Sequence, residues 1–88
     1  MANTQSVLSA AQGTFIVNGT DVVELLCDAI VALEDTLFES IQVRGNEVKD
    51  TYIQDSATAV KAGAIIRPLN GFKFNSVQLT SGSVILVL

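Results

Sequence analysis

The chain has 88 residues, of which 49% are apolar and 16% are charged, with one cysteine and no histidine. This length fits a single domain that buries about 63% of its unfolded surface, which is too little interior for so many apolar side chains, so we expect an oligomer. The missing histidine and the single cysteine exclude a Ser-His-Asp triad, a cysteine-rich zinc site and an internal disulfide.

Charge is divided unevenly along the chain. Residues 1–43 carry six acids and no base, a formal −6, whereas residues 44–88 carry five bases and three acids, a formal +2. The acidic half argues against a nucleic-acid partner, and it is either a solvated face or a surface matched to a basic region of another subunit or partner. No segment has the ~18 apolar residues of a membrane span, and the start lacks signal-peptide features, so we expect no membrane partner and synthesis in a cytoplasm.

The first third of the chain predicts an extended N-terminal arm over residues 1–13, followed by a single β-rich domain over residues 14–88. Residues 14–17 predict a strand, and Asn18-Gly19 is typical of a tight hairpin turn. Residues 21–33 are ambiguous, because their apolar residues fit one helical face while their β-branched residues favour a strand. We favour the strand and keep one short helix as the alternative.

The middle of the chain continues this pattern. Residues 36–43 predict a strand with Leu37, Ile41 and Val43 on one face, Glu39 as the exception on that face, and Phe38, Ser40 and Gln42 on the other. Gly45-Asn46 predicts a turn. Residues 48–53 and 57–66 are weaker strand candidates.

The last third begins with a corner at residues 68–71, where the only proline stands. Alternation in residues 72–79 changes phase near Asn75-Ser76, which predicts a bulge. A turn at residues 80–83 leads to an apolar strand, residues 84–88. Such a strand must be covered, either as a central strand of a sheet or by another chain. The chain therefore predicts an all-β fold, a compact sandwich, barrel or jelly-roll-like module.

The residues that could carry chemistry are few. Cys27 has no nearby base to stabilise a thiolate, so we expect a small buried hydrophobe. Glu34-Asp35 would point to opposite faces in a strand; in a turn they could converge on calcium with Asp28 or Glu39, although no spaced oxygen-ligand loop supports this. There is no glycine-rich phosphate loop. We therefore assign no catalytic, cofactor-binding or metal-binding residue and expect no enzymatic activity.

Three segments carry a resemblance to a known group of proteins: ALEDTLFESI at residues 32–41, AGAII at 62–66, and GFKFNSVQLTSGSVI at 71–85. Their order is similar to that in short virion proteins of tailed bacteriophages, including capsid decoration (cement) proteins. The likeness spans roughly residues 29–88 and its pieces are short. In such proteins the C-terminal segment of the chain often continues past the last strand, whereas this chain stops at Val87-Leu88.

The resemblance implies a small β-rich protein, often a homotrimer, which binds the major capsid protein on the outside of the virion and stabilises the shell. Under it, the capsid-contact arm comprises Thr4, Gln5, Ser6, Val7 and Leu8. The subunit interface or core comprises Phe72, Phe74, Val84, Ile85, Leu86, Val87 and Leu88. The alternatives are a tail or fibre accessory protein and a small soluble host-directed regulatory or binding module.

Overall fold

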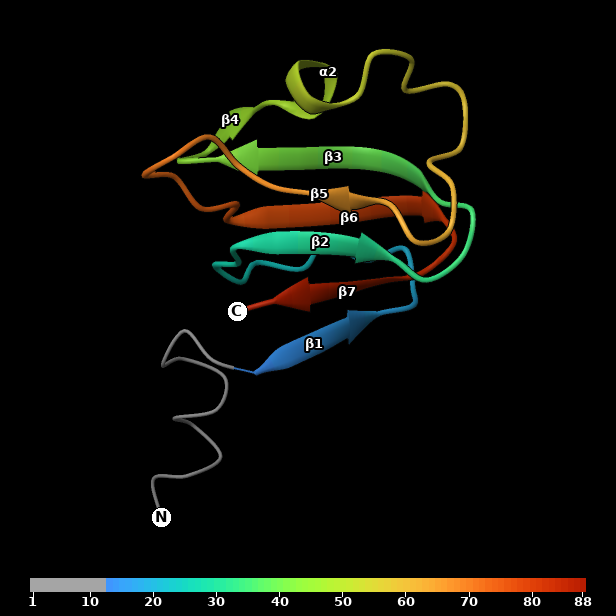
Figure 1. Cartoon of the computed structure of the whole chain (residues 1–88), viewed down its shortest axis with the longest axis horizontal. Helices are drawn as coiled ribbons and strands as arrows, with labels where there is room; N and C mark the ends of the chain where they lie inside the picture. The colour runs from blue at the N-terminus through green and yellow to red at the C-terminus, as the bar shows by residue number, and fades with distance from the viewer. Residues whose placement is uncertain (1–12) are drawn as a thin grey trace.

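The computed structural model describes residues 13–88, which form two antiparallel sheets and one short helix (Figure 1). One sheet has the strand order β1-β7-β2-β5 and the other has the order β4-β3-β6. The elements are β1 (Thr14–Val17), β2 (Ala29–Ala32), β3 (Leu37–Val43), β4 (Asn46–Glu47), α2 (Lys49–Tyr52), β5 (Ile65–Ile66), β6 (Ser76–Ser81) and β7 (Val84–Val87). The predicted all-β class is confirmed, and the arrangement of the two sheets resembles a sandwich.

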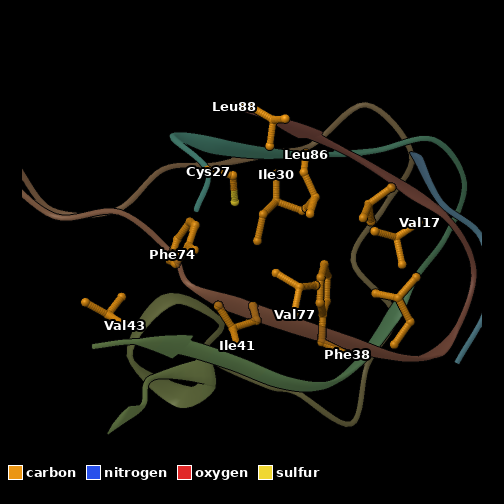
Figure 2. Close-up of a cluster of buried hydrophobic side chains, with 12 residues drawn as sticks. Val17, Cys27, Ile30, Phe38, Ile41, Val43, Phe74, Val77, Leu86 and Leu88 are labelled. Carbon is orange, nitrogen blue, oxygen red and sulfur yellow. The ribbon is translucent and has the colours of Figure 1, made fainter. Parts of the chain in front are cut away.

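The core lies between the two sheets, and Figure 2 shows its side chains meeting from both sides. The four-stranded sheet contributes Ile30, Val84 and Leu86, and the three-stranded sheet contributes Phe38, Ile41, Val77 and Leu79. Phe74 is fully buried, and Tyr52 packs edge-on against it with ring centroids 5.2 Å apart. Each such side chain stabilises the fold by roughly 1.5–3 kcal/mol through loss of its contact with water.

The C-terminal strand β7 lies in the interior of its sheet, hydrogen-bonded to β1 on one edge and to β2 on the other. Its register places Leu86 opposite both Phe15 and Ile30. The last residue is also held, because the backbone N–H of Leu88 donates to the Gly13 carbonyl at 3.0 Å. The sequence predicted that the apolar C-terminal strand is covered either by neighbouring strands of its own sheet or by another chain. The first of these is therefore present within a single chain.

Two expectations for the first third of the chain are wrong. Asn18-Gly19 does not close a hairpin, since β1 pairs with β7 and neither turn residue has a positive φ. The alternative of a helix within residues 21–33 is also wrong. That segment is extended: Val23 and Cys27 pair with Val77 and Phe74 along the free edge of β6, and the chain then passes into β2 of the other sheet.

Strand β3 confirms the prediction for residues 36–43, but the assignment of its faces is wrong. Phe38 is buried together with Ile41 and Val43, because Glu39 is an extra residue in a bulge between Phe38 and Ser40. A second irregularity lies between Leu37 and Phe38, where Thr80 of β6 has no partner residue on β3. The Thr80 hydroxyl donates to the Glu39 carboxylate at 3.1 Å. The bulge explains why Glu39 broke the apolar alternation.

The remaining local expectations are partly confirmed. The β3–β4 turn falls on Arg44-Gly45, one residue earlier than expected, and both have positive φ, as a two-residue hairpin requires. Residues 48–53 are not a strand, since they contain α2, and residues 57–66 contain only β5. The corner at 68–71 is confirmed by the hydrogen bond from Phe72 N–H to the Leu69 carbonyl, 3.0 Å.

A second corner separates β6 from β7 and sends them into different sheets. Thr80 and Ser81 still belong to β6, so the turn is shorter than the expected residues 80–83. Gly82 has φ +93°, and a Cβ there would lie 2.7 Å from Thr36 Cα and 2.8 Å from the Asp35 carbonyl oxygen. Only glycine therefore fits this corner.

Glu47 links β4 to its neighbours through three hydrogen bonds. Its carboxylate accepts from the Ser40 hydroxyl at 2.5 Å, from the Ile41 N–H at 2.9 Å and from the Lys49 N–H at 3.2 Å. Partial burial opposes ionisation, but these bonds outweigh it and lower the pKa of Glu47 below its ordinary value of 4.5. The ionised carboxylate therefore stabilises the fold above that value, and this contribution is lost as the pH falls through the lowered pKa.

Replacing this carboxylate by an amide, Glu47→Gln, should lower the free energy of unfolding by about 1 kcal/mol at pH 7, a modest value because the residue is largely exposed. The difference from the unmodified protein should shrink at an acidic pH below the lowered pKa of Glu47, where both side chains are neutral. Urea unfolding followed by circular dichroism at the two pH values measures this. Asp50→Asn, at an exposed carboxylate with no hydrogen-bond partner among residues 13–88, is the control. An equal difference at both pH values would contradict the assignment.

Candidate assembly surface

The outward face of the four-stranded sheet is apolar across its whole width. Strand register aligns Ile16 with Ile85, Ile85 with Val31, and Val31 with Ile65, so one row of β-branched side chains crosses all four strands. The next row contains Thr14, Val87 and Ala29. We call these seven residues the outer face: Thr14, Ile16, Ala29, Val31, Ile65, Ile85 and Val87.

The outer face carries no charged residue although part of it lies open to solvent. Ile16 and Ile65, at its two ends, are 55% and 56% exposed, while Val31, Ile85 and Val87 are half-buried. An antiparallel sheet with one solvated face normally alternates apolar and polar residues, whereas a sheet that is covered on both faces is apolar on both. The outer face therefore has the apolar composition of a sheet that is covered on both faces.

The expected core or interface residues fall into three groups. Phe74, Val84, Leu86 and Leu88 are buried in the core, the last at 4% exposure. The two remaining residues of the terminal strand, Ile85 and Val87, alternate with them and belong to the outer face. Phe72 is not a core residue: it is 37% exposed, and its ring lies beside Arg44. The expected arm residues Thr4 to Leu8 lie outside the described residues.

Phe72 lines a pocket beside the β3–β4 hairpin. The pocket has a volume of about 310 Å³, and we call it the Arg44 pocket, lined by Val43, Arg44, Asn46, Val48, Thr51, Tyr52, Leu69 and Phe72. The Arg44 guanidinium carbon lies 4.9 Å from the Phe72 ring centroid, a cation–π contact. No acid lines the pocket, and Arg44 forms no ion pair with any residue from 13 to 88.

Hydrogen bonds hold both walls of the Arg44 pocket in place. The N–H of Gly45 at the hairpin tip donates to Asn75 Oδ1 at 3.2 Å, and the N–H of Leu69 donates to the Tyr52 hydroxyl at 3.0 Å. The Tyr52 ring is fixed in turn by its edge-on contact with Phe74. The pocket is therefore preformed, with Leu69 projecting at 61% exposure.

The carboxylates considered for calcium are dispersed. Glu34 and Asp35 lie in a bend, not a strand, where Glu34 accepts from the Ser83 hydroxyl at 2.8 Å and Asp35 accepts from the Ala62 N–H at 3.1 Å. The Ala62 N–H and the Lys61 ammonium lower the pKa of Asp35. Asp28 instead pairs with Lys73 at 2.7 Å. In the described part of the chain, no three acids, histidines or cysteines gather closely enough to hold a metal ion.

Cys27 is fully buried, as expected for a small hydrophobe. Burial, with a smaller contribution from the negative charge of Asp28, raises the pKa of its thiol to about 12. The thiol is therefore protonated at neutral pH, and it is neither a nucleophile nor a ready ligand. Within residues 13–88, none of the helical structure is long and apolar enough to cross a membrane.

Sequence reasoning missed the two surfaces that stand out in the structure. A signal for the outer face was present, because residues 29–33 and 84–88 are apolar without alternation, a pattern typical of strands covered on both faces. The Arg44 pocket had no such signal, since its walls come from two separate stretches of the chain, residues 43–52 and residues 69–72. In comparisons with known proteins, no family model, no curated protein and no solved structure matches this chain.

Proposed function

We propose that this protein is a non-enzymatic structural component of a tailed-bacteriophage virion, a decoration protein that binds the outer capsid surface and stabilises the shell. The observation that carries the proposal is the charge-free outer face of the four-stranded sheet. A surface of this kind is suited to being covered by another protein, and it offers no group that could carry out catalysis. The particle is proposed to be a phage virion because the order of three segments of this chain resembles that in phage virion proteins.

The occupant of the outer face is, in this proposal, the major capsid protein. The N-terminal segment enters the fold at Gly13 and leads directly into β1, the edge strand of the same sheet. Residues 1–12 therefore join the fold beside the outer face, and in this proposal they form one continuous contact with the shell together with that face. The exposed edge of β1 also offers backbone groups for strand pairing, and its Phe15 and Ile16 side chains are 37% and 55% exposed.

The stabilising effect follows from mass action. A protein that binds the assembled lattice, but not free capsid subunits, lowers the free energy of the assembled state by an amount that grows with its concentration. If each copy is one member of an oligomer, several weak contacts act together because binding of the first raises the effective concentration of the others. A small domain without an active site is sufficient for this role.

Mass spectrometry of purified particles with absolute quantification tests the proposal. A decoration protein should be present in copy numbers comparable to those of the major capsid protein. A few copies per particle would instead identify a tail or fibre accessory protein. Absence from the particles would overturn the structural role and favour a host-directed regulatory or binding module.

Deleting residues 1–12 should weaken binding to the shell by at least about tenfold while leaving the fold intact. The deletion retains Gly13, whose carbonyl accepts the Leu88 N–H. Binding is measured by co-sedimentation with particles stripped of the protein, and thermal unfolding of the truncated chain controls for its fold. Unchanged binding by the truncated protein would remove the arm from the contact.

A further inference from the structure

The three-stranded sheet presents different surfaces at its two edges. At one edge lie the β3–β4 hairpin and α2 (Figure 1), which line the Arg44 pocket together with Leu69 and Phe72. At the other edge, beyond β6, residues 23–27 pair with Phe74 and Val77. One surface is an apolar hollow with a cation at its rim, and the other is an acidic ridge.

The ridge is formed by alternate residues of the extended segment. Val23 exchanges two backbone hydrogen bonds with Val77 of β6, and Cys27 exchanges two with Phe74, just before β6, all at 2.9–3.0 Å. Val23 and Leu25 pack against the core. The intervening residues therefore point away, and Val22 and Leu26 are 52% and 62% exposed with Glu24 exposed between them. We call Val22, Glu24 and Leu26 the Glu24 ridge.

The pocket and the ridge match in charge and in apolar character. At the pocket, Arg44 stands between the exposed apolar side chains of Leu69 and Phe72. At the ridge, Glu24 stands between two exposed aliphatic side chains. Neither Arg44 nor Glu24 has an ion-pair partner among residues 13–88, whereas Lys61 and Lys73 are both paired with aspartates.

We propose that the Arg44 pocket of one copy binds the Glu24 ridge of a second copy, so that subunits associate head to tail. Because the two surfaces lie on opposite edges of one sheet, the contact is heterologous, and repetition with the appropriate rotation closes a ring. This contact deepens the proposed function by supplying an oligomer whose copies could bind the shell together, and it leaves the outer face available for the shell.

The proposed contact combines one apolar anchor side chain with one ion pair. Val22 or Leu26 would fill the hollow beside Tyr52 and exclude water, and the ion pair between Arg44 and Glu24 would set register and orientation. Reversal of either charge places like charges together in the contact, and a double reversal restores the pair. The two residues therefore allow a direct test with this chain alone.

The experiment is a charge swap read by light scattering after size-exclusion chromatography and by sedimentation over a concentration series. The unmodified protein should form a closed oligomer at micromolar concentration. Arg44→Glu and Glu24→Arg should each weaken association by about 100-fold, and the double variant should recover most of it. Arg67→Glu, an equal charge change at an exposed arginine outside the pocket, should leave association unchanged.

A second readout reports on the pocket itself. Tyr52 is the only tyrosine and the chain has no tryptophan, so tyrosine fluorescence reports on the surroundings of one side chain that lines the pocket. Its emission should change on dilution of the unmodified protein and the double variant, and stay constant for the folded single variants. Circular dichroism establishes that each variant is folded.

Three results would overturn the contact: a monomer at all concentrations, oligomers that persist in both single variants, or failure of the folded double variant to recover. The particle measurement is independent of these. A recovered oligomer that is absent from particles would retain the head-to-tail contact and reject the decoration role.

Discussion

Replacing Gly82 with alanine should lower the free energy of unfolding by about 3 kcal/mol, a large part of the total stability of a domain this small. Two effects combine. An alanine at φ +93° is strained by about 1–3 kcal/mol, and its Cβ would collide with the Thr36 backbone and side chain and with the Asp35 carbonyl. Urea unfolding followed by circular dichroism measures the loss.

The strain and the collision can be separated with a matched glycine. Gly71 has nearly the same backbone conformation, φ +88°, but nothing lies within 4 Å of a Cβ built there. Gly71→Ala should therefore show the conformational cost alone, about 1 kcal/mol. If the two variants lose equal stability, close packing of Thr36 against the corner is not what requires glycine at residue 82.

The structural reason for the large effect is that this corner joins the two sheets. Thr36 is fully buried beside Gly82; its N–H donates to the Val60 carbonyl at 2.9 Å, and its hydroxyl donates to the Glu34 carbonyl at 2.8 Å. The Thr36 backbone therefore cannot withdraw without loss of these bonds. A shift at the corner would also move β7, the central strand of the other sheet.

The double variant Ile16→Lys/Ile65→Lys should lose shell binding by at least about 100-fold while changing the free energy of unfolding by no more than about 1 kcal/mol. Both isoleucines are more than half exposed, and both stand on edge strands, where lysine is well tolerated. On the outer face, however, two ammonium groups would have to be desolvated against the partner. Co-sedimentation with stripped particles measures the binding.

Gln54→Lys/Ala57→Lys is the matched control for this variant. It makes the same change in net charge at two exposed residues in the loop between α2 and β5, which are not part of the outer face. It should bind the shell as the unmodified protein does. Equal binding by both double variants would mean that the outer face is not the surface that the shell covers.

Local sequence patterns were sufficient for the strands whose residues alternate or run apolar between turn residues. Thr14–Val17, the strand at 37–43 and the terminal strand all lie close to where the sequence placed them. The exceptions are instructive. Phe38 was assigned to the wrong face because a single extra residue, Glu39, reverses the alternation, and that bulge depends on the pairing with β6.

The candidate surfaces were less accessible to sequence reasoning. Phe72 and Phe74 have the same local pattern, yet Phe74 pairs with Cys27 and is buried in the core, whereas Phe72 follows the corner at residues 68–71 and lines the Arg44 pocket. Similarly, Asn18-Gly19 is a favourable hairpin dipeptide, but β1 gains more by pairing with β7 at the other end of the chain. Propensity at two residues is small compared with the burial of a whole strand.

The all-β class, the small number of reactive side chains and the need to cover an apolar C-terminal strand could all be predicted in advance, because these properties follow from composition and local periodicity. How the C-terminal strand is covered depends on contacts between distant parts of the chain. β7 is covered within the chain by β1 and β2 along its edges and by the core on one face, while its other face continues the open outer face. Pairing between residues 14–17 and 84–87 is non-local, so short-range pattern does not specify it, whereas burial across the whole domain does.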